Sequence, residues 1–224
     1  MAQSPVRPEF GPSLPELMQR RFGMSVRAAG FVLAAILAIV VIAGIVKQTQ
    51  GDGTVRAIVT APTAFNLRYE PGKLVRVASR AGEQLRLTTK AGDPNPSSVT
   101  VRAALLPAYP GDDPTVALPI FASLAIAQME RADPKFVERG EGRARVNAQP
   151  SYQIQYLTTI GGRVMYGRRV FVFPDPRDQP GAHDGADLTL LAARSQVVTN
   201  PDDVGSNGVT KIPYRSFRLG ATPP

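Results

Sequence analysis

The chain has 224 residues with a formal net charge of +8, no cysteine and a single histidine. The absence of cysteine excludes disulfides, zinc–thiolate sites, iron–sulfur clusters and thiol catalysis, and one histidine excludes a multi-histidine metal site within the chain. An apolar fraction of 43% is enough to form a folded core, so we expect one or two domains. The net positive charge is compatible with binding to a nucleic acid or to an anionic membrane surface, and it can also have no binding role.

The first predicted element is a transmembrane helix at residues 28–46, an uncharged apolar run bracketed by Arg27 and Lys47. Roughly 20 apolar residues in a helix span a hydrocarbon core of about 30 Å. A cleaved signal peptide is one alternative, but its apolar region has about 7–15 residues and ends at a small-residue cleavage site. The other, a buried core helix with no polar face, would require a larger protein around it.

The basic residues that flank this run predict its orientation. Lys47 and Arg56 are the next ones after it, whereas those before it are Arg7, Arg20, Arg21 and Arg27. Because cytoplasmic flanks are enriched in Lys and Arg, we expect the N-terminus in the cytoplasm and the rest of the chain outside it. The sequence therefore predicts a single-pass protein of the cell membrane, with the lipid bilayer as a partner through residues 28–46.

The predicted span divides the chain into further segments. Residues 1–27 are rich in proline and are expected to be a mostly disordered cytoplasmic tail, in which a short helix could form at Leu14–Phe22. Residues 47–63 are expected to form a stalk. The extracytoplasmic domain is expected at 64–219, and residues 220–224 form a C-terminal tail.

Within 64–219, apolar and polar residues alternate as they do in strands with one buried face. The apolar positions with this period are Leu85 and Leu87; Val99, Val101, Ala103 and Leu105; and Tyr152, Ile154 and Tyr156. A further strand is predicted at Asp187–Arg194. The sequence thus favours several half-buried strands in one sheet.

A hairpin is predicted at Gly161-Gly162, because both residues can adopt the positive φ that tight hairpin turns require. The run after it, Arg163–Phe173, is apolar on both faces, which predicts a central strand. The main predicted helix is Leu118–Arg131, opened by Pro119 and apolar on almost all sides. We therefore expect it between the sheet and another layer.

A weaker helix is predicted at Thr199–Asn207. Strands before and after a main helix predict the α+β class, with a mostly antiparallel sheet packed with that helix.

The element order resembles that of a known family. The segment Phe65–Gly72, with sequence FNLRYEPG, resembles the opening strand and turn of PsbP/Mog1/LpqN-like domains, and the main helix, the long hairpin and the Leu188–Leu190 strand follow in the same order. Leu74 stands where the family usually has an aromatic residue, often tryptophan. The resemblance implies a binding or assembly module, often at a membrane, and it carries no functional residue over to this chain.

Two kinds of loop could hold a chemical site. His183 lies in a Pro/Gly-rich segment near Asp175 and Asp187, and carboxylates can orient an imidazole, but no nucleophile is patterned with it. The acidic pairs Asp112-Asp113 and Asp202-Asp203 each lie beside a proline. Neither has the spaced ligands of a calcium loop, so we interpret them as turn and helix-capping residues.

Several arginines could form a basic surface. Arg163, Arg168 and Arg169 cluster on one predicted strand, and Arg143 and Arg145 could lie beside it. Nucleic acid binding would require stacking aromatic residues on the same face, and Tyr166 and Phe171 are nearby, but the predicted location outside the cytoplasm argues against it. A lipid headgroup or an acidic envelope polymer suits the location better, and a solvated strand face is the simplest reading.

The sequence leads to three functional hypotheses. The first is a non-catalytic adaptor or assembly module for envelope or membrane proteins, because an anchor and a compact domain occur without a recognisable catalytic set. The second is a carrier of an apolar or lipid ligand, in a pocket between helix 118–131 and the sheet. The third is an enzyme with an unrecognised site. We assign no catalytic, cofactor-binding or metal-ligating residue from the sequence.

Overall fold

A computed structural model of the protein describes residues 31–32 and 53–221. Its compact domain begins at Gly53. The elements in chain order are β1 (Val55–Val59), β2 (Phe65–Tyr69), β3 (Val75–Arg76), β4 (Glu83–Thr88), β5 (Ser97–Leu105), the 3₁₀ turn η1 (Pro114–Val116), α3 (Leu118–Ala132), β6 (Val137–Val146), β7 (Gln149–Ile160), β8 (Arg163–Val172), β9 (Asp184–Ala193), the 3₁₀ turns η2 (Pro201–Asp203) and η3 (Gly208–Thr210), α4 (Lys211–Ser216) and β10 (Arg218–Leu219).

The domain has the predicted α+β character, and its large sheet is antiparallel, with the order β3-β4-β5-β9-β8-β7-β6. A second sheet, of order β1-β2-β10, was not predicted. It joins the two ends of the domain, because β2 lies between β1 and β10. Strand β1 lies inside the range 47–63 that was expected to be a stalk, so regular structure begins before residue 64.

The predicted hairpin is confirmed. Gly161 and Gly162 have φ values of 58° and 78°, and the turn pairs Ile160 with Arg163 at the start of β8. As predicted, β8 is an interior strand, with β7 and β9 on its two sides, and it is buried on both faces along most of its length.

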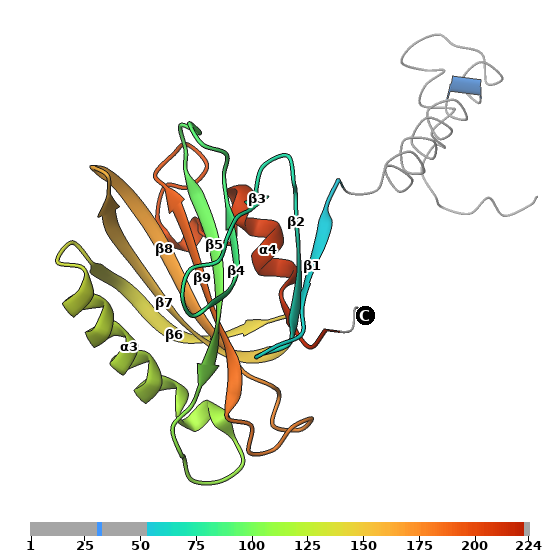
Figure 1. The fold of residues 1–224 in the computed structure, drawn as a ribbon, viewed down its shortest axis with the longest axis vertical. Coiled ribbons are helices and arrows are strands. Elements are labelled where there is room, and N and C mark those ends of the chain that lie inside the picture. Colours follow the sequence, from blue (N-terminus) through green and yellow to red (C-terminus); the bar gives the residue numbers. More distant parts are fainter. Residues whose placement is uncertain (1–30, 33–52, 222–224) are drawn as a thin grey trace, which may run out of the picture. The chain divides into compact units, whose positions relative to one another are not determined.

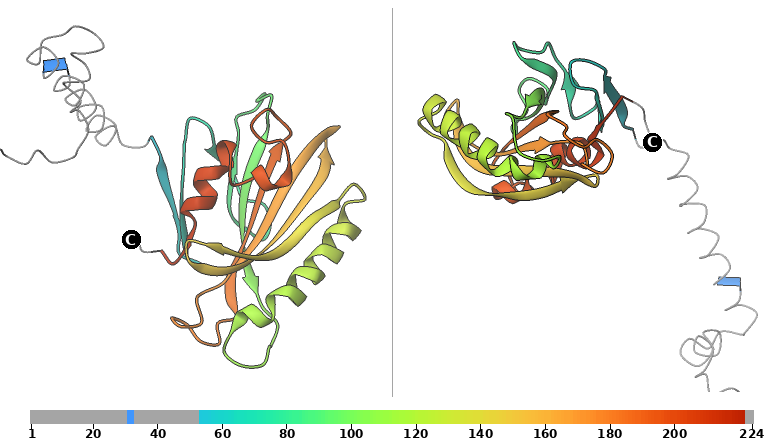
Figure 2. Two further views of the ribbon diagram at one scale, coloured as in Figure 1. Left: turned by 180° about the vertical axis from the view of Figure 1, so that it is seen from behind. Right: turned by 90° about the horizontal axis from the view of Figure 1, so that it is seen from below.

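Two cores lie on opposite faces of the large sheet. On one face, β8 and β9 direct side chains such as Val170 and Leu188 toward Phe65 of the small sheet and Phe217 beyond α4. On the other face, α3 covers the side chains of β7 and β8 near one edge. Figures 1 and 2 show α3 along the β6–β7 side, whereas α4 and β1–β2 lie near the other edge of the sheet.

The burial expected along β5 changes at its middle. Val99 and Val101 are buried as predicted, but Ala103 is exposed and Leu105 is 67% exposed. Their neighbours Ala104 and Leu106 are buried instead, in the core beneath α3. Alternation along a strand fixes which residues share a face, but the layer that covers that face decides which of them are buried.

Two helix predictions need correction. The expected helix at Thr199–Asn207 is only the 3₁₀ turn η2, which Asn200 and Asp203 cap at its start. Helix α3 begins with a proline near its N-terminus as predicted, but it has the sheet on one side and an open surface on the other. The second covering layer expected from its composition is absent from the described residues.

None of the helices within the described ranges is long and apolar enough to cross a membrane. The predicted span at 28–46 lies outside those ranges apart from residues 31–32, and so do the predicted tail at 1–27 and its helix at Leu14–Phe22.

Candidate functional site

The outward surface of α3 carries exposed apolar side chains. Ile120 and Leu124 are 66% and 61% exposed, and Val116, which precedes them on η1, is 50% exposed. Residues four apart in a helix are neighbours on one side, so Ile120 and Leu124 form a continuous line. We refer to Val116, Ile120 and Leu124 as the α3 stripe. Contiguous apolar surface of this kind commonly marks an interaction site on a soluble domain.

The inner side of α3 explains why its position is well fixed. Ala122 and Ala125 are buried and small, which lets the helix approach the sheet closely. Phe121 packs edge-on against Phe171 of β8, with ring centroids 4.9 Å apart. Ile126 closes the same core. Ile120 and Leu124 of the α3 stripe are therefore presented by a helix that is packed against the sheet, and Val116 precedes them on η1.

The entry to α3 is shaped by one of the predicted acidic pairs. The Asp113 side chain accepts a hydrogen bond from the Thr115 backbone N–H at 2.8 Å and so caps η1, which leads directly into the helix. At the other pair, Asp203 accepts hydrogen bonds from both the backbone and the hydroxyl of Thr199. These bonds hold the pKa of Asp203 below its ordinary value. The capping role predicted for Asp113 and Asp203 is confirmed.

The predicted arginine cluster on β8 is not a single surface. Arg163 donates to the Pro94 carbonyl at 2.7 Å, and Arg169 forms a two-pronged ion pair with Asp187. Arg168 points to the opposite face, where it donates to the Asp202 carbonyl at 2.7 Å and lies over the Tyr214 ring. Adjacent residues of a strand face opposite sides of the sheet, so these arginines serve three separate structural contacts.

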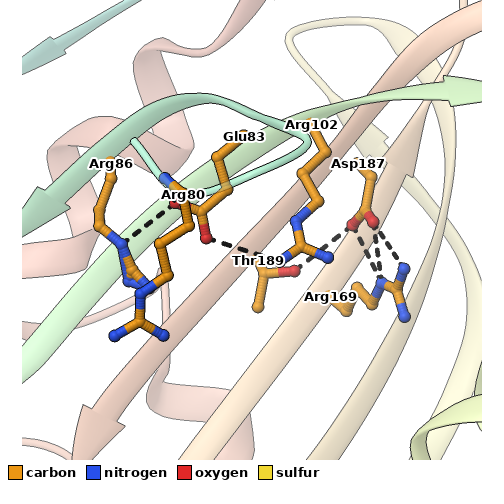
Figure 3. A network of polar contacts seen from close by, with 7 residues as sticks. All are labelled: Arg80, Glu83, Arg86, Arg102, Arg169, Asp187 and Thr189. Carbon is orange, nitrogen blue, oxygen red and sulfur yellow. Dashed lines mark hydrogen bonds and ion pairs between the residues drawn. The ribbon is translucent and has the colours of Figure 1, made fainter. Parts of the chain in front are cut away.

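Arg169 belongs to a polar network on the α3 side of the large sheet, shown in Figure 3. Its guanidinium lies 2.6–3.1 Å from the carboxylate oxygens of Asp187. Glu83 accepts a bond from Arg86 at 3.1 Å and lies 3.5 Å from Arg102. Burial lowers the pKa of Arg169, but the charge and hydrogen bonds of Asp187 outweigh this and raise it above its ordinary value. Each carboxylate thus has at least one guanidinium partner.

The remaining two predicted arginines, Arg143 and Arg145, are on β6 and line a cavity of about 650 Å³ beside the first turn of α3. Asp113 and the ion pair of Asp175 with Arg177 line the same cavity. Its walls therefore combine charged side chains with apolar ones such as Leu118 of α3 and Pro150. Met129 of α3 lines a smaller cavity of about 230 Å³ against the sheet, while core residues fill much of the rest of the interface. The pocket postulated for a ligand carrier therefore stays a prediction.

His183 fastens two loops together. Its Nδ1 lies 3.3 Å from the Leu106 carbonyl, and its ring lies against Tyr109, whose hydroxyl donates to the Ala182 carbonyl at 2.7 Å. Asp175 and Asp187, the carboxylates considered as its partners, pair with arginines instead. Within 31–32 and 53–221, no group of three His, Asp or Glu side chains could hold a metal ion.

Comparison with known proteins identifies the fold. No family model matches the chain, and no curated protein matches it in sequence. The solution structure of cyanobacterial PsbP from Synechocystis is similar over 74% of this chain and 92% of its own, with 12% identity and a TM-score of 0.50. A crystal structure of LpqN, described as involved in cell envelope biogenesis of Mycobacterium tuberculosis, covers 76% of this chain and 94% of its own, with 13% identity and a TM-score of 0.47. The domain has a PsbP-like α+β fold. The resemblance predicted from the sequence is thereby confirmed for the fold.

Proposed function

We propose that the protein is a membrane-anchored, non-catalytic assembly module of a bacterial envelope, whose extracytoplasmic domain binds a protein partner through the α3 stripe. The observation that carries the proposal is the exposure of Ile120 and Leu124 on a helix whose sequence is apolar on almost all sides. Such a composition suits two buried faces, and the described residues of the domain bury only one. A partner would supply the missing layer.

The anchor and its orientation are part of the proposal and rest on the sequence. The apolar run 28–46 has the length of a membrane span, and the denser basic flank on its N-terminal side favours a cytoplasmic N-terminus. The description of LpqN as a protein of cell envelope biogenesis agrees with an envelope role, but a similarity this low does not assign that role to this chain.

A protein is a better occupant of the α3 stripe than a free apolar ligand. The stripe is an exposed line of side chains on α3 and the turn before it, and a small ligand would require a concave pocket. An apolar groove of another protein can cover a line of side chains that are four residues apart in the sequence. Glu130 and Arg131 follow the stripe at the end of α3 and would provide the polar rim that such interfaces have.

The partner can be identified by photo-crosslinking in intact membranes. A photoreactive residue at position 120 or 124 is expected to capture the same protein, whereas one at Val197, which is 57% exposed far from α3 in sequence, should not. The captured protein is then purified and titrated against the full chain. Ile120→Ser together with Leu124→Ser should raise its Kd by about 30- to 800-fold, which corresponds to about 2–4 kcal/mol for two partly exposed aliphatic side chains.

The stability of the same double variant separates an interface from a structural role. Both side chains are mostly exposed, so the free energy of unfolding should change by no more than about 0.5 kcal/mol for each substitution. A large loss of stability with no change in partner affinity would refute the proposal. Crosslinks only to residues 1–52 of the same chain, or only to a second copy, would also refute a separate protein partner.

A further inference from the structure

A second surface, formed by the small sheet and α4, has a strong positive charge. A cleft of about 390 Å³ lies there, and five of its lining residues are cationic. They come from both ends of the domain and are Arg56, Arg68, Lys211, Arg215 and Arg218. We call this surface the basic cleft. All five side chains belong to exposed residues, so the cleft is open to a large partner.

The fold brings these charges together by strand pairing and by one short helix. Arg56 of β1 is the cross-strand partner of Arg68 of β2, and like charges directly opposite each other destabilise a sheet. Lys211 and Arg215 are one helical turn apart on α4. The Asn147 side chain donates to the carbonyls of Arg215 and Phe217, which fixes the end of α4 against the β6–β7 turn. These hydrogen bonds help to hold the repulsive arrangement in place.

The cleft differs from the sites of Arg169 and Arg177 in the side chains that line it. No carboxylate lines it, within the part of the chain that the structure describes. Within those described residues, Arg56, Lys211 and Arg215 form no ion pair. Elsewhere the guanidinium groups of Arg169 and Arg177 each face a carboxylate. An anion from outside the domain would neutralise the cleft.

The position of the cleft in the chain suggests the source of that anion. Arg56 lies ten residues beyond Val46, the end of the predicted span, and an extended chain covers at most about 3.6 Å per residue. With the proposed anchor, the cleft is therefore tethered within about 40 Å of the membrane surface. Ile58, which is 47% exposed, lies two residues from Arg56 and therefore on the same face of β1. Half-buried Ile212 lines the cleft. Apolar side chains beside clustered basic ones are typical of surfaces that contact anionic lipid.

We propose that the basic cleft binds the phosphate groups of anionic phospholipids in the membrane that anchors the chain. The proposal rests on the anchor in the proposed function. Guanidinium groups match phosphate oxygens in a two-pronged geometry, and Lys211 adds a compact positive charge. Nucleic acid is a poorer occupant because no aromatic side chain for base stacking lines the cleft among the described residues. This surface is separate from the Arg163–Arg169 strand, where the sequence suggested an anionic partner.

The test uses the full chain in nanodiscs, made either from phosphatidylcholine alone or with added phosphatidylglycerol. Amide hydrogen exchange of 55–69 and 211–219 is expected to be about fivefold slower or more in the anionic nanodiscs, the factor that corresponds to about 1 kcal/mol for one basic residue at an anionic surface. About 1 M salt, at which the screening length falls to about 3 Å, should abolish the difference.

Charge-matched variants assign the effect to the cleft. Arg56→Gln with Arg215→Gln should remove the slower exchange. Lys90→Gln with Arg139→Gln removes the same charge from exposed residues outside the cleft and should leave it unchanged. Equal exchange in both lipids, or equal loss in both variants, would overturn the proposal. Slower exchange with inorganic phosphate in neutral nanodiscs, and no effect of phosphatidylglycerol, would overturn the lipid assignment in favour of a free anion.

Failure of the anchor is recognised separately, because the chain would then not enter nanodiscs at all. In that case the same variants are compared by cosedimentation with phosphatidylglycerol vesicles, which requires no anchor. Retention of the contrast between cleft and control variants would support the cleft without the anchor. Loss of the contrast would overturn it.

Discussion

The ion pair of Arg169 with Asp187 supplies the sharpest test of how the α3 side of the sheet is stabilised. The two side chains are only 18% and 7% exposed, and the closest distance between them is 2.6 Å. Asp187→Ala would leave the guanidinium without its carboxylate above the Phe171 ring. Removal of one partner of a buried pair costs about 3–5 kcal/mol, which is a large part of the 5–15 kcal/mol that usually stabilises a domain.

Urea unfolding of residues 53–224, which contain both cores, would measure this loss. With an m-value of about 2 kcal/mol/M, the midpoint should fall by about 1.5–2.5 M. Arg169→Met combined with Asp187→Leu removes both charges at similar volume and should return the stability to within about 1 kcal/mol of the wild type. Asp178→Asn, on an exposed residue, is the control and should change it by less than about 0.5 kcal/mol. A single variant as mild as the control, or a double variant as unstable as the single, would refute the reasoning.

Three further predictions follow from packing, turn geometry and ionisation. Gly167→Ala should destabilise the domain by about 1–3 kcal/mol, because the new Cβ would overlap the Tyr156 ring, whereas Gly142→Ala on β6, with open space around it, should be nearly neutral in the same thermal melts. Ala148→Gly should stabilise it by about 0.5 kcal/mol, because Ala148 has a φ of 68° in the β6–β7 turn; an unchanged melting temperature would contradict this. Asp203→Asn should lower the melting temperature at neutral pH. Because hydrogen bonds from Thr199 and its neighbours depress the folded pKa of Asp203, its contribution is complete above the unfolded pKa of about 4 and is lost as the pH falls below it, so the two proteins should converge in acid. A difference that stays constant down to low pH would show that the carboxylate charge does not matter.

Local patterns predicted the parts of the fold that local physics determines. Two glycines fixed the β7–β8 turn, and the alternation around Ile154 identified a strand with one buried face. The β6–β7 turn, Asn147-Ala148, was missed because it lacks the glycine that usually marks such turns. The small sheet was missed because β1 and β10 come from opposite ends of the domain and β2 joins them. No local period encodes that pairing.

The candidate surfaces were harder to predict, and for two different reasons. The separation of Arg168 from Arg169 follows from strand geometry and was available in the sequence once the strand was assigned. The exposed face of α3 could not be predicted from the sequence, because an apolar helix can be buried either by its own chain or by a partner. The basic cleft was hidden because its cations are dispersed over about 160 residues between Arg56 and Arg218.

The two proposed surfaces belong to opposite sides of the large sheet, and this separation makes a further prediction. The small sheet and α4 adjoin the core on one face, and α3 covers the other. A domain held at lipid headgroups through the basic cleft would thus keep the α3 stripe accessible to a protein. Ile120→Ser with Leu124→Ser should leave the lipid-dependent hydrogen exchange unchanged, and Arg56→Gln with Arg215→Gln should leave partner affinity in neutral detergent unchanged. Distant sites without shared contacts give additive effects within about 0.5 kcal/mol. A stronger coupling, in which a change at one surface alters binding at the other by more than about threefold, would mean that the partner and the membrane share one interface.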